Sequence, residues 1–183
     1  MKKKYIIITF LISTLSLLGC SKNDEAGSEN DKIETFGKLT AEIQSDKGSY
    51  THKTTFEMSQ MIGRGEELYE LYIMATDDNK RGSIVIKALI SGKGTYKFKH
   101  SPSAHDPYGN ISYVDDKFNN YYVDASNSAT GHCELIITEF PDQLTPARPQ
   151  KIKATFSGNL YDIEGRKLKV NKGNLDGFVT LWN

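Results

Sequence analysis

Apolar and polar residues alternate along most of this chain, and that alternation limits what it can fold into. The segments 39–44, 52–58 and 151–160 place every second side chain on one apolar side. This is the period of a β-strand with one buried face. The segment 83–90 is apolar almost throughout and is typical of a central strand.

Further runs of the same kind predict strands at 67–75, 95–99, 111–115, 120–125, 134–140, 168–170 and 175–182. About ten short strands in one chain of this length predict an all-β domain, either an antiparallel β-sandwich or a β-barrel. The segment 58–68, with glycines at 63 and 65, is the one candidate for a short helical turn. The single cysteine of this region, Cys133, alternates with Leu135 and Ile137, and we expect it in the core.

The first residues follow a different pattern, in which three lysines precede an uncharged apolar run over residues 5–18. As a helix this run spans about 21 Å, which is too short for a hydrocarbon core of about 30 Å. A basic start, a short apolar run and a small residue at the boundary are typical of a secretory signal peptide, here residues 1–19.

The boundary itself reads Leu17-Leu18-Gly19-Cys20. This resembles the lipobox of bacterial lipoproteins, which implies that Cys20 is the lipidated first residue of the mature chain and that its acyl chains bind a membrane. Several acyl chains on one residue give stable anchorage, whereas one chain binds only marginally. The alternative is a plain secreted protein with a free cysteine.

The residues after Cys20 read S-K-N-D-E. They resemble the lipoprotein export signal of Bacteroidota, with Lys22, Asp24 and Glu25 matching and Asn23 standing where an acidic residue is often found. The resemblance implies an outer-membrane lipoprotein displayed on the cell surface. A generic polar tether would instead leave it on the periplasmic face.

The body of the chain has balanced charge. Residues 20–34 form a polar segment that we expect to be a flexible tether, and residues 35–183 form a single β-rich domain. Of 23 basic and 23 acidic residues, the signal peptide and tether hold five of each, which leaves 18 of each in the domain. Such a balance favours no nucleic-acid partner.

The last third of the chain contains a strand–turn–strand pattern with spaced glycines. It resembles the C-terminal part of small Bacteroidota outer-membrane lipoproteins of unknown function, and implies a β-rich fold without adding any activity. The matching residues are Phe156, Gly158, Leu160, Gly165, Val170, Gly173 and Leu175.

Motifs for catalysis or metal binding are missing from the sequence. The four histidines form no compact metal-ligand spacing, and we expect neither a catalytic residue, a metal nor a cofactor. A loop carrying His105 and Asp106 leaves a hydrolase as an alternative. The acidic stretch at Asp77-Asp78-Asn79 predicts a hairpin turn, with a calcium site as the alternative.

The segment 105–122 interleaves aromatic residues with Asp and Asn. Such a mixture suits a sugar ring or a protein partner, and the alternative is aromatic pairing across a hairpin. The candidate binding residues are Tyr108, Phe118, Tyr121 and Tyr122. We therefore expect a lipid-anchored envelope or cell-surface protein that binds a protein or carbohydrate and has no catalytic activity. A lipocalin-like barrel for a small ligand is the second alternative.

Overall fold

The computed structural model describes residues 37–56, 59–64, 67–99, 109–123 and 131–182. The chain divides into two compact units, Met1–Lys32 and Ile33–Asn183, and every described residue belongs to the second. Within the described ranges, no helix is long and apolar enough to cross a membrane. Several residues singled out in the sequence lie outside the described ranges, namely Cys20, Lys22, Asp24, Glu25, His105, Asp106 and Tyr108.

The described domain is all-β and its strands are mostly antiparallel, as the sequence predicts. Among the described ladders, only the one between β11 and β3 is parallel. The strands are β1 (Gly37–Ser45), β2 (Gly48–Phe56), β3 (Ser59–Gly63), β4 (Tyr69–Thr76), β5 (Gly82–Ile90), β6 (Gly94–Lys99), β7 (Gly109–Asp115), β8 (Asn120–Tyr121), β9 (His132–Glu139), β10 (Pro149–Tyr161) and β11 (Lys167–Trp182).

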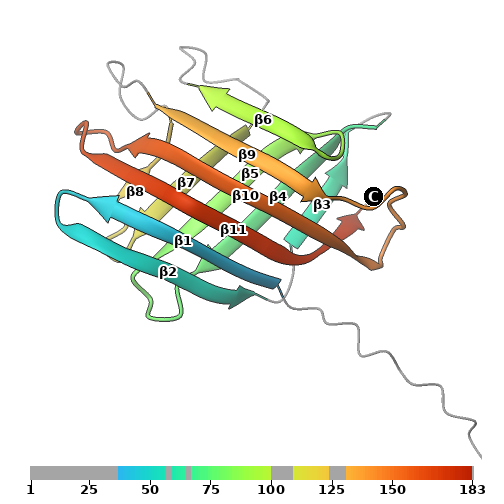
Figure 1. Cartoon of the computed structure of the whole chain (residues 1–183), viewed down its shortest axis with the longest axis horizontal. Coiled ribbons are helices and arrows are strands. Elements are labelled where there is room, and N and C mark those ends of the chain that lie inside the picture. Colours follow the sequence, from blue (N-terminus) through green and yellow to red (C-terminus); the bar gives the residue numbers. More distant parts are fainter. Residues whose placement is uncertain (1–36, 57–58, 65–66, 100–108, 124–130, 183) are drawn as a thin grey trace, which may run out of the picture. The chain divides into compact units, whose positions relative to one another are not determined.

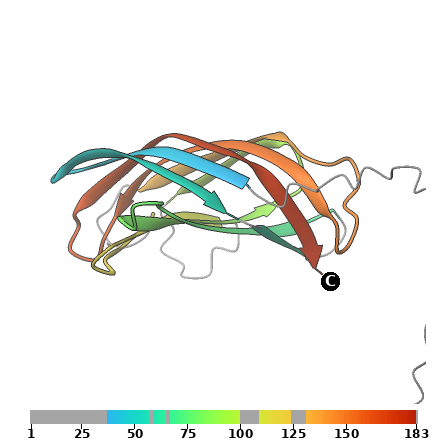
Figure 2. The same cartoon turned by 90° about the horizontal axis from the view of Figure 1, so that it is seen from below.

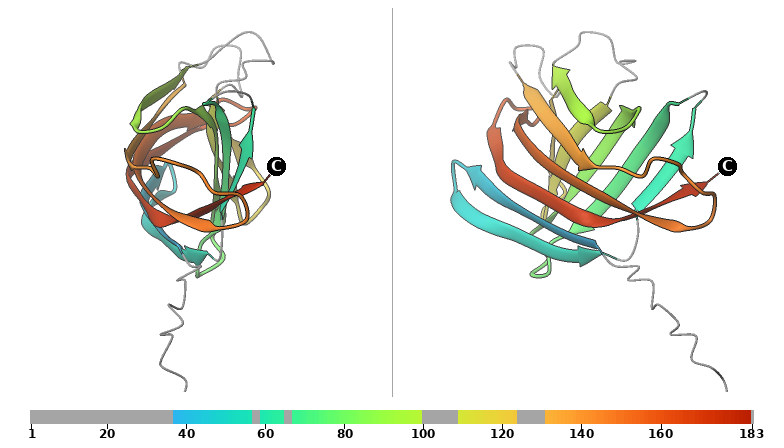
Figure 3. Two further views of the ribbon diagram at one scale, coloured as in Figure 1. Left: turned by 90° about the vertical axis from the view of Figure 1, so that its right-hand side faces the viewer. Right: turned by 45° about the vertical axis from the view of Figure 1, so that its right-hand side comes forward.

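All eleven strands belong to one sheet that curls into a half-barrel. Its order is β6-β9-β10-β11-β3-β4-β5-β7-β8, and β1 pairs with β11 and carries β2 on its other side. In Figure 1, β1, β2, β9, β10 and β11 lie in front of β4, β5 and β7. Figure 2 shows the same two sides as curved layers, and the end view in Figure 3 shows them facing each other around the core.

Contacts outside the main ladder join the two sides. Tyr122, just after β8, exchanges two backbone hydrogen bonds with Tyr161 at the end of β10, at 2.9 and 3.0 Å. At another margin, the backbone N–H of Lys53 in β2 donates to the Asp77 carboxylate at 3.0 Å. The N–H of Asp78 donates to the Lys53 carbonyl at 2.9 Å. Hydrogen bonds outside the strand ladders therefore also hold the two sides of the half-barrel together.

Alternating side chains fill the interior. β5 buries every second residue, including Ile84, Ile86 and Ile90, and β10 buries Ile152, Ala154, Phe156, Gly158 and Leu160, as the alternation predicts. Cys133 is also buried, which confirms its predicted place in the core, and burial raises the pKa of its thiol to about 12. The inward faces therefore form one packed apolar cluster.

Two expectations about local structure are wrong. The segment 58–68 contains strand β3, which pairs with β4 and with the end of β11, and not a helical turn. The predicted strands at 168–170 and 175–182 are parts of the single strand β11, which continues through a bulge near Lys172. A bulge inserts a residue without ending the strand, so the break in alternation resembled a turn.

Candidate functional site

Three hairpin turns of the domain share one sequence pattern, an Asp followed four residues later by Arg or Asn. They are Asp77–Arg81 between β4 and β5, Asp115–Asn119 between β7 and β8, and Asp162–Arg166 between β10 and β11. In each turn the Asp carboxylate accepts a hydrogen bond from the backbone N–H two residues later, at 2.9–3.1 Å. These bonds are the Asx-turn interaction that favours Asp at such positions.

The fourth residue of each turn has a left-handed backbone. The φ angles are 57° at Lys80, 64° at Phe118 and 79° at Gly165. Glycine adopts this conformation freely, whereas a bulky side chain is disfavoured there. Phe118 is therefore strained, and its ring is 84% exposed instead of being packed. Strained backbone conformations occur often at functional sites, so Phe118 is a candidate binding residue.

The turn between β4 and β5 is fixed by an ion pair. Arg81 donates to both carboxylate oxygens of Asp77, at 2.9 and 3.2 Å, and to the Thr51 carbonyl at 2.7 Å. Burial raises the pKa of Asp77, but hydrogen bonds from Arg81 and from the N–H groups of Lys53 and Asn79 outweigh it and lower the pKa to about 2. The carboxylate thus remains charged and holds the guanidinium in place.

Two tyrosines continue this network. The guanidinium of Arg81 lies over the Tyr50 ring, 4.1 Å from its centre, in a cation–π contact. The Tyr50 and Tyr113 hydroxyls are hydrogen-bonded to each other, and Tyr113 donates to the Arg81 carbonyl at 2.9 Å. Gly82 makes this arrangement possible, because a Cβ there would lie 2.0 Å from the Tyr113 hydroxyl.

His52 lies behind these tyrosines and is fully buried. Its Nε2 lies 3.2 Å from the Ala75 carbonyl oxygen, while no partner is found for its Nδ1 among the described atoms. Its ring meets the Tyr113 ring edge-on, with centroids 6.4 Å apart. Burial lowers the pKa of His52, although the nearby Asp77 carboxylate acts in the opposite direction.

The turns and tyrosines surround a hollow that we call the turn-end cleft, with a volume of about 400 Å³. Its floor includes Tyr50, Tyr113 and Tyr121, and its rim comes from the turns 45–49 and 115–117. This rim carries lysines 47 and 117 together with aspartates 46, 115 and 116. A cleft with aromatic walls and charges of both signs suits a polar ligand or the surface of another protein.

The aromatic residues proposed from the sequence occupy different places. Tyr121 is 6% exposed and forms part of the floor, with its ring centroid 6.3 Å from that of Tyr113. Phe118 is at the tip of the turn whose residues 115–117 line the rim. Tyr122 is half-buried and makes the bridge to Tyr161. The structure thus places Phe118 and Tyr121 beside one cleft, but not in a single exposed patch.

Tyr50, Arg81 and Tyr113 are not among the candidate binding residues that the sequence predicts. They come from three strands or turns far apart in the chain, so no local spacing links them. The repeated Asp-x-x-x-Arg pattern is the one signal that could have drawn attention to Arg81. The Asp77 turn is a hairpin turn, as predicted, and among the described residues no group of three or more His, Cys, Asp or Glu could hold a metal ion.

Comparison with protein families, with curated proteins and with solved structures gives no match for this chain. The resemblance of its first residues to bacterial lipoproteins, and of its last third to small Bacteroidota lipoproteins, therefore stays a prediction.

Proposed function

We propose that this chain is a lipid-anchored protein of the bacterial outer membrane, displayed on the cell surface, that binds a protein partner through its turn-end cleft. The first part of the proposal rests on the signal peptide, the Leu-Leu-Gly-Cys boundary and the residues Lys22, Asp24 and Glu25. Display on the periplasmic face is the alternative, and protease treatment of intact cells separates the two.

The observation that carries the binding role is Phe118. Its ring is 84% exposed at the tip of a hairpin turn, on a backbone with a φ of 64° that glycine would occupy more easily. An exposed aromatic ring is the kind of side chain that anchors protein interfaces by entering a pocket on the partner. A strained backbone that presents such a ring suggests that the ring is kept for contact.

The surroundings of Phe118 support the same role. The Asp115 carboxylate accepts hydrogen bonds from the N–H groups of Lys117 and Asn119, at 2.9 and 2.8 Å, and from the Asn119 side chain at 2.7 Å. These bonds fix the turn that carries the ring, so little conformational freedom remains to be lost on binding. The rim charges, which are of both signs, supply polar contacts around such an anchor.

The test compares variants of the full chain in envelopes of the bacterium that produces it. Covalent crosslinking of proteins within reach is followed by mass spectrometry. Phe118→Gly removes the ring and suits the left-handed backbone, so folding is preserved. Ile163→Ser is the matched control, because Ile163 is 78% exposed on the equivalent turn between β10 and β11, and residues 162–166 of that turn do not line the cleft.

We expect a partner that is crosslinked by the wild type and by Ile163→Ser, and at least tenfold less by Phe118→Gly. Equal crosslinking by all three chains contradicts the proposal. The lipocalin-like alternative needs an enclosed apolar cavity, and the hydrolase alternative needs His105 or Asp106 to meet another acid or histidine. Both stay predictions.

A further inference from the structure

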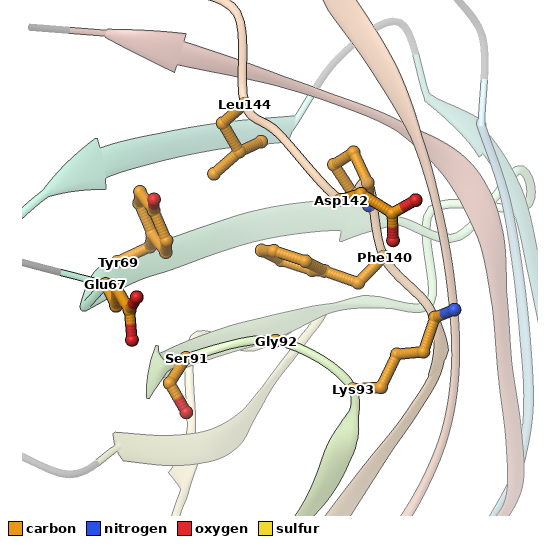
Figure 4. Close-up of a pocket in the computed structure, with 9 residues that line it drawn as sticks. Glu67, Tyr69, Ser91, Gly92, Lys93, Phe140, Asp142 and Leu144 are labelled. Atoms are coloured by element: carbon orange, nitrogen blue, oxygen red, sulfur yellow. The ribbon is translucent and has the colours of Figure 1, made fainter.

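A second hollow lies where β5 turns into β6 and where the chain leaves β9 (Figure 4). We call it the aromatic cleft, and its volume of about 380 Å³ lies in the range of small-ligand sites, about 300–1,000 Å³. It shares no lining residue with the turn-end cleft. Any ligand here is therefore independent of the protein partner proposed above.

Aromatic and aliphatic side chains form its apolar wall. The rings of Tyr69 and Phe140 have centroids 6.1 Å apart and are tilted by 45°. Leu144 lies beside Tyr69 in Figure 4, and all three side chains are partly buried against the core. Because they are only partly buried, they leave apolar surface facing the hollow.

The turn between β5 and β6 forms a fixed wall. The Tyr96 hydroxyl accepts a hydrogen bond from the Ser91 N–H at 3.1 Å and donates one to the Gly92 carbonyl at 2.9 Å. Gly92 has a φ of 142°, a conformation that residues with a Cβ rarely adopt. The turn is therefore held in the shape that places Ser91 and Lys93 at the rim.

The charged groups of the rim make no ion pairs. Glu67, Lys93 and Asp142 line the cleft, and none has an ion-pair or hydrogen-bond partner among the described residues. Nearby Glu70 behaves differently, because it pairs with Arg64 and with Lys87, the latter at 3.1 Å. Glu67 also has a φ of 60°, which is strained for a residue other than glycine.

We propose that the aromatic cleft binds an uncharged sugar ring. A sugar has a face of C–H groups that packs on aromatic rings and an edge of hydroxyls that both donate and accept hydrogen bonds. The Tyr69–Phe140 wall supplies the surface for that face. The carboxylates of Glu67 and Asp142 accept hydrogen bonds, and the Lys93 ammonium donates them.

The charges of the rim favour a neutral ligand over an anion or a cation. An anion would face two carboxylates against one ammonium, which is unfavourable. A simple cation would be attracted by the carboxylates but opposed by Lys93, and it would use no donor of the cleft. A neutral ligand rich in hydroxyls finds both donors and acceptors at the rim and brings no charge that must be desolvated.

The test titrates the purified full chain with neutral methyl glycosides of glucose, galactose, mannose and N-acetylglucosamine, followed by ligand-observed NMR. We expect at least one glycoside to bind and its Kd to rise at least tenfold in Glu67→Gln and in Asp142→Asn. Both changes keep the size of exposed side chains, so the fold is retained. Asp116→Asn, which removes an exposed carboxylate from the turn-end cleft, leaves the Kd unchanged.

Three results overturn the proposal: no glycoside binds at 50 mM, choline binds instead, or binding is equal in wild type and both cleft variants. In the bound state we expect magnetisation from the protein to reach the C–H face of the sugar most strongly. If this preferential transfer to the C–H face is lost in Phe140→Leu, the sugar packs on the Phe140 ring. A sugar that binds equally well to Phe140→Leu would instead contradict stacking.

Discussion

The turn-end cleft and the aromatic cleft are both built on tyrosines and charged side chains, yet the Asp77–Arg81 pair beside the first differs from the carboxylates of the second. At the turn-end cleft, Asp77 and Arg81 are bound to each other, to the backbone and to the Tyr50 ring. At the aromatic cleft, Glu67 and Asp142 have no ion-pair partner within the described residues. The first arrangement stabilises the fold, whereas the second leaves hydrogen-bonding groups available to a ligand.

This difference predicts where mutation costs stability and where it costs only binding. Charges that are satisfied inside the protein contribute to the free energy of unfolding, and their removal leaves buried partners unpaired. Exposed charges without partners contribute little to stability. The substitutions below test this distinction.

The largest expected effect is that of Gly82→Val. A Cβ at position 82 would lie 2.0 Å from the Tyr113 hydroxyl and 2.5 Å from the Val114 carbonyl, so the tyrosine must leave its place. We expect a loss of about 3 kcal/mol in the free energy of unfolding, measured by urea denaturation. Gly63→Ala is the control, because nothing lies within 4 Å of its added Cβ. A well-tolerated Gly82→Val would show that Tyr113 is not held where the structure places it.

Asp77→Asn comes next. It removes the charge that accepts hydrogen bonds from Arg81 and from the N–H groups of Lys53 and Asn79, and we expect a loss of about 2 kcal/mol near neutral pH. The pKa of Asp77 is about 2 in the folded state, whereas that of an ordinary Asp side chain is 3.8, so its contribution is complete above pH 4 and is lost as pH falls toward 2. Urea denaturation at several pH values should show wild type and variant converging at the acid end.

Asp142→Asn is the matched change at the aromatic cleft. The Asp142 side chain is exposed and has no ion-pair partner among the described residues, so we expect its stability to stay within about 0.5 kcal/mol of the wild type. A loss as large as that of Asp77→Asn would remove the contrast between the two clefts.

His52 is expected to make the stability of the domain depend on pH. Burial lowers the pKa of His52 in the folded state, whereas the unfolded chain takes up a proton near pH 6.5. The free energy of unfolding therefore falls as pH drops below about 7, by at most about 1.4 kcal/mol per pH unit. His52→Leu should flatten this slope, measured between pH 7.5 and 5.

The only expected gain in stability belongs to Phe118→Gly. Glycine relieves the left-handed backbone, and we expect a gain of about 1 kcal/mol, or about 3 °C in Tm. Calorimetry measures this gain. A loss of stability would show that the Phe118 ring packs against the domain and is not presented to a partner.

The strands could be predicted from the sequence because alternation is a local signal. β5 and β10 have the predicted buried faces, and the hairpin between β7 and β8 forms at the predicted turn. β3 could not be found in this way. β3 is five residues long, and its neighbour β11 lies more than a hundred residues later in the chain. Whether these residues form a strand therefore depends on a contact between distant segments, which local sequence does not show.

The candidate site shows the same limit. Phe118 and Tyr121 stood out because aromatic residues cluster locally in the sequence, but their exposures differ, at 84% and 6%, because Phe118 is in the turn and Tyr121 is in β8 on the side that faces the core. Tyr50, Arg81 and Tyr113 meet only because the sheet curls and brings three hairpins together. The curvature of the sheet cannot be predicted from the spacing of residues along the chain.

The position of β11 affects when this domain can fold. Its 16 residues are the last strand of the chain, and they pair with β1, β10 and β3. Until they are present, those three strands have open edges and neither side of the half-barrel is complete. Truncation before Lys167 would therefore remove the strand that these three share and expose strand edges prone to aggregation.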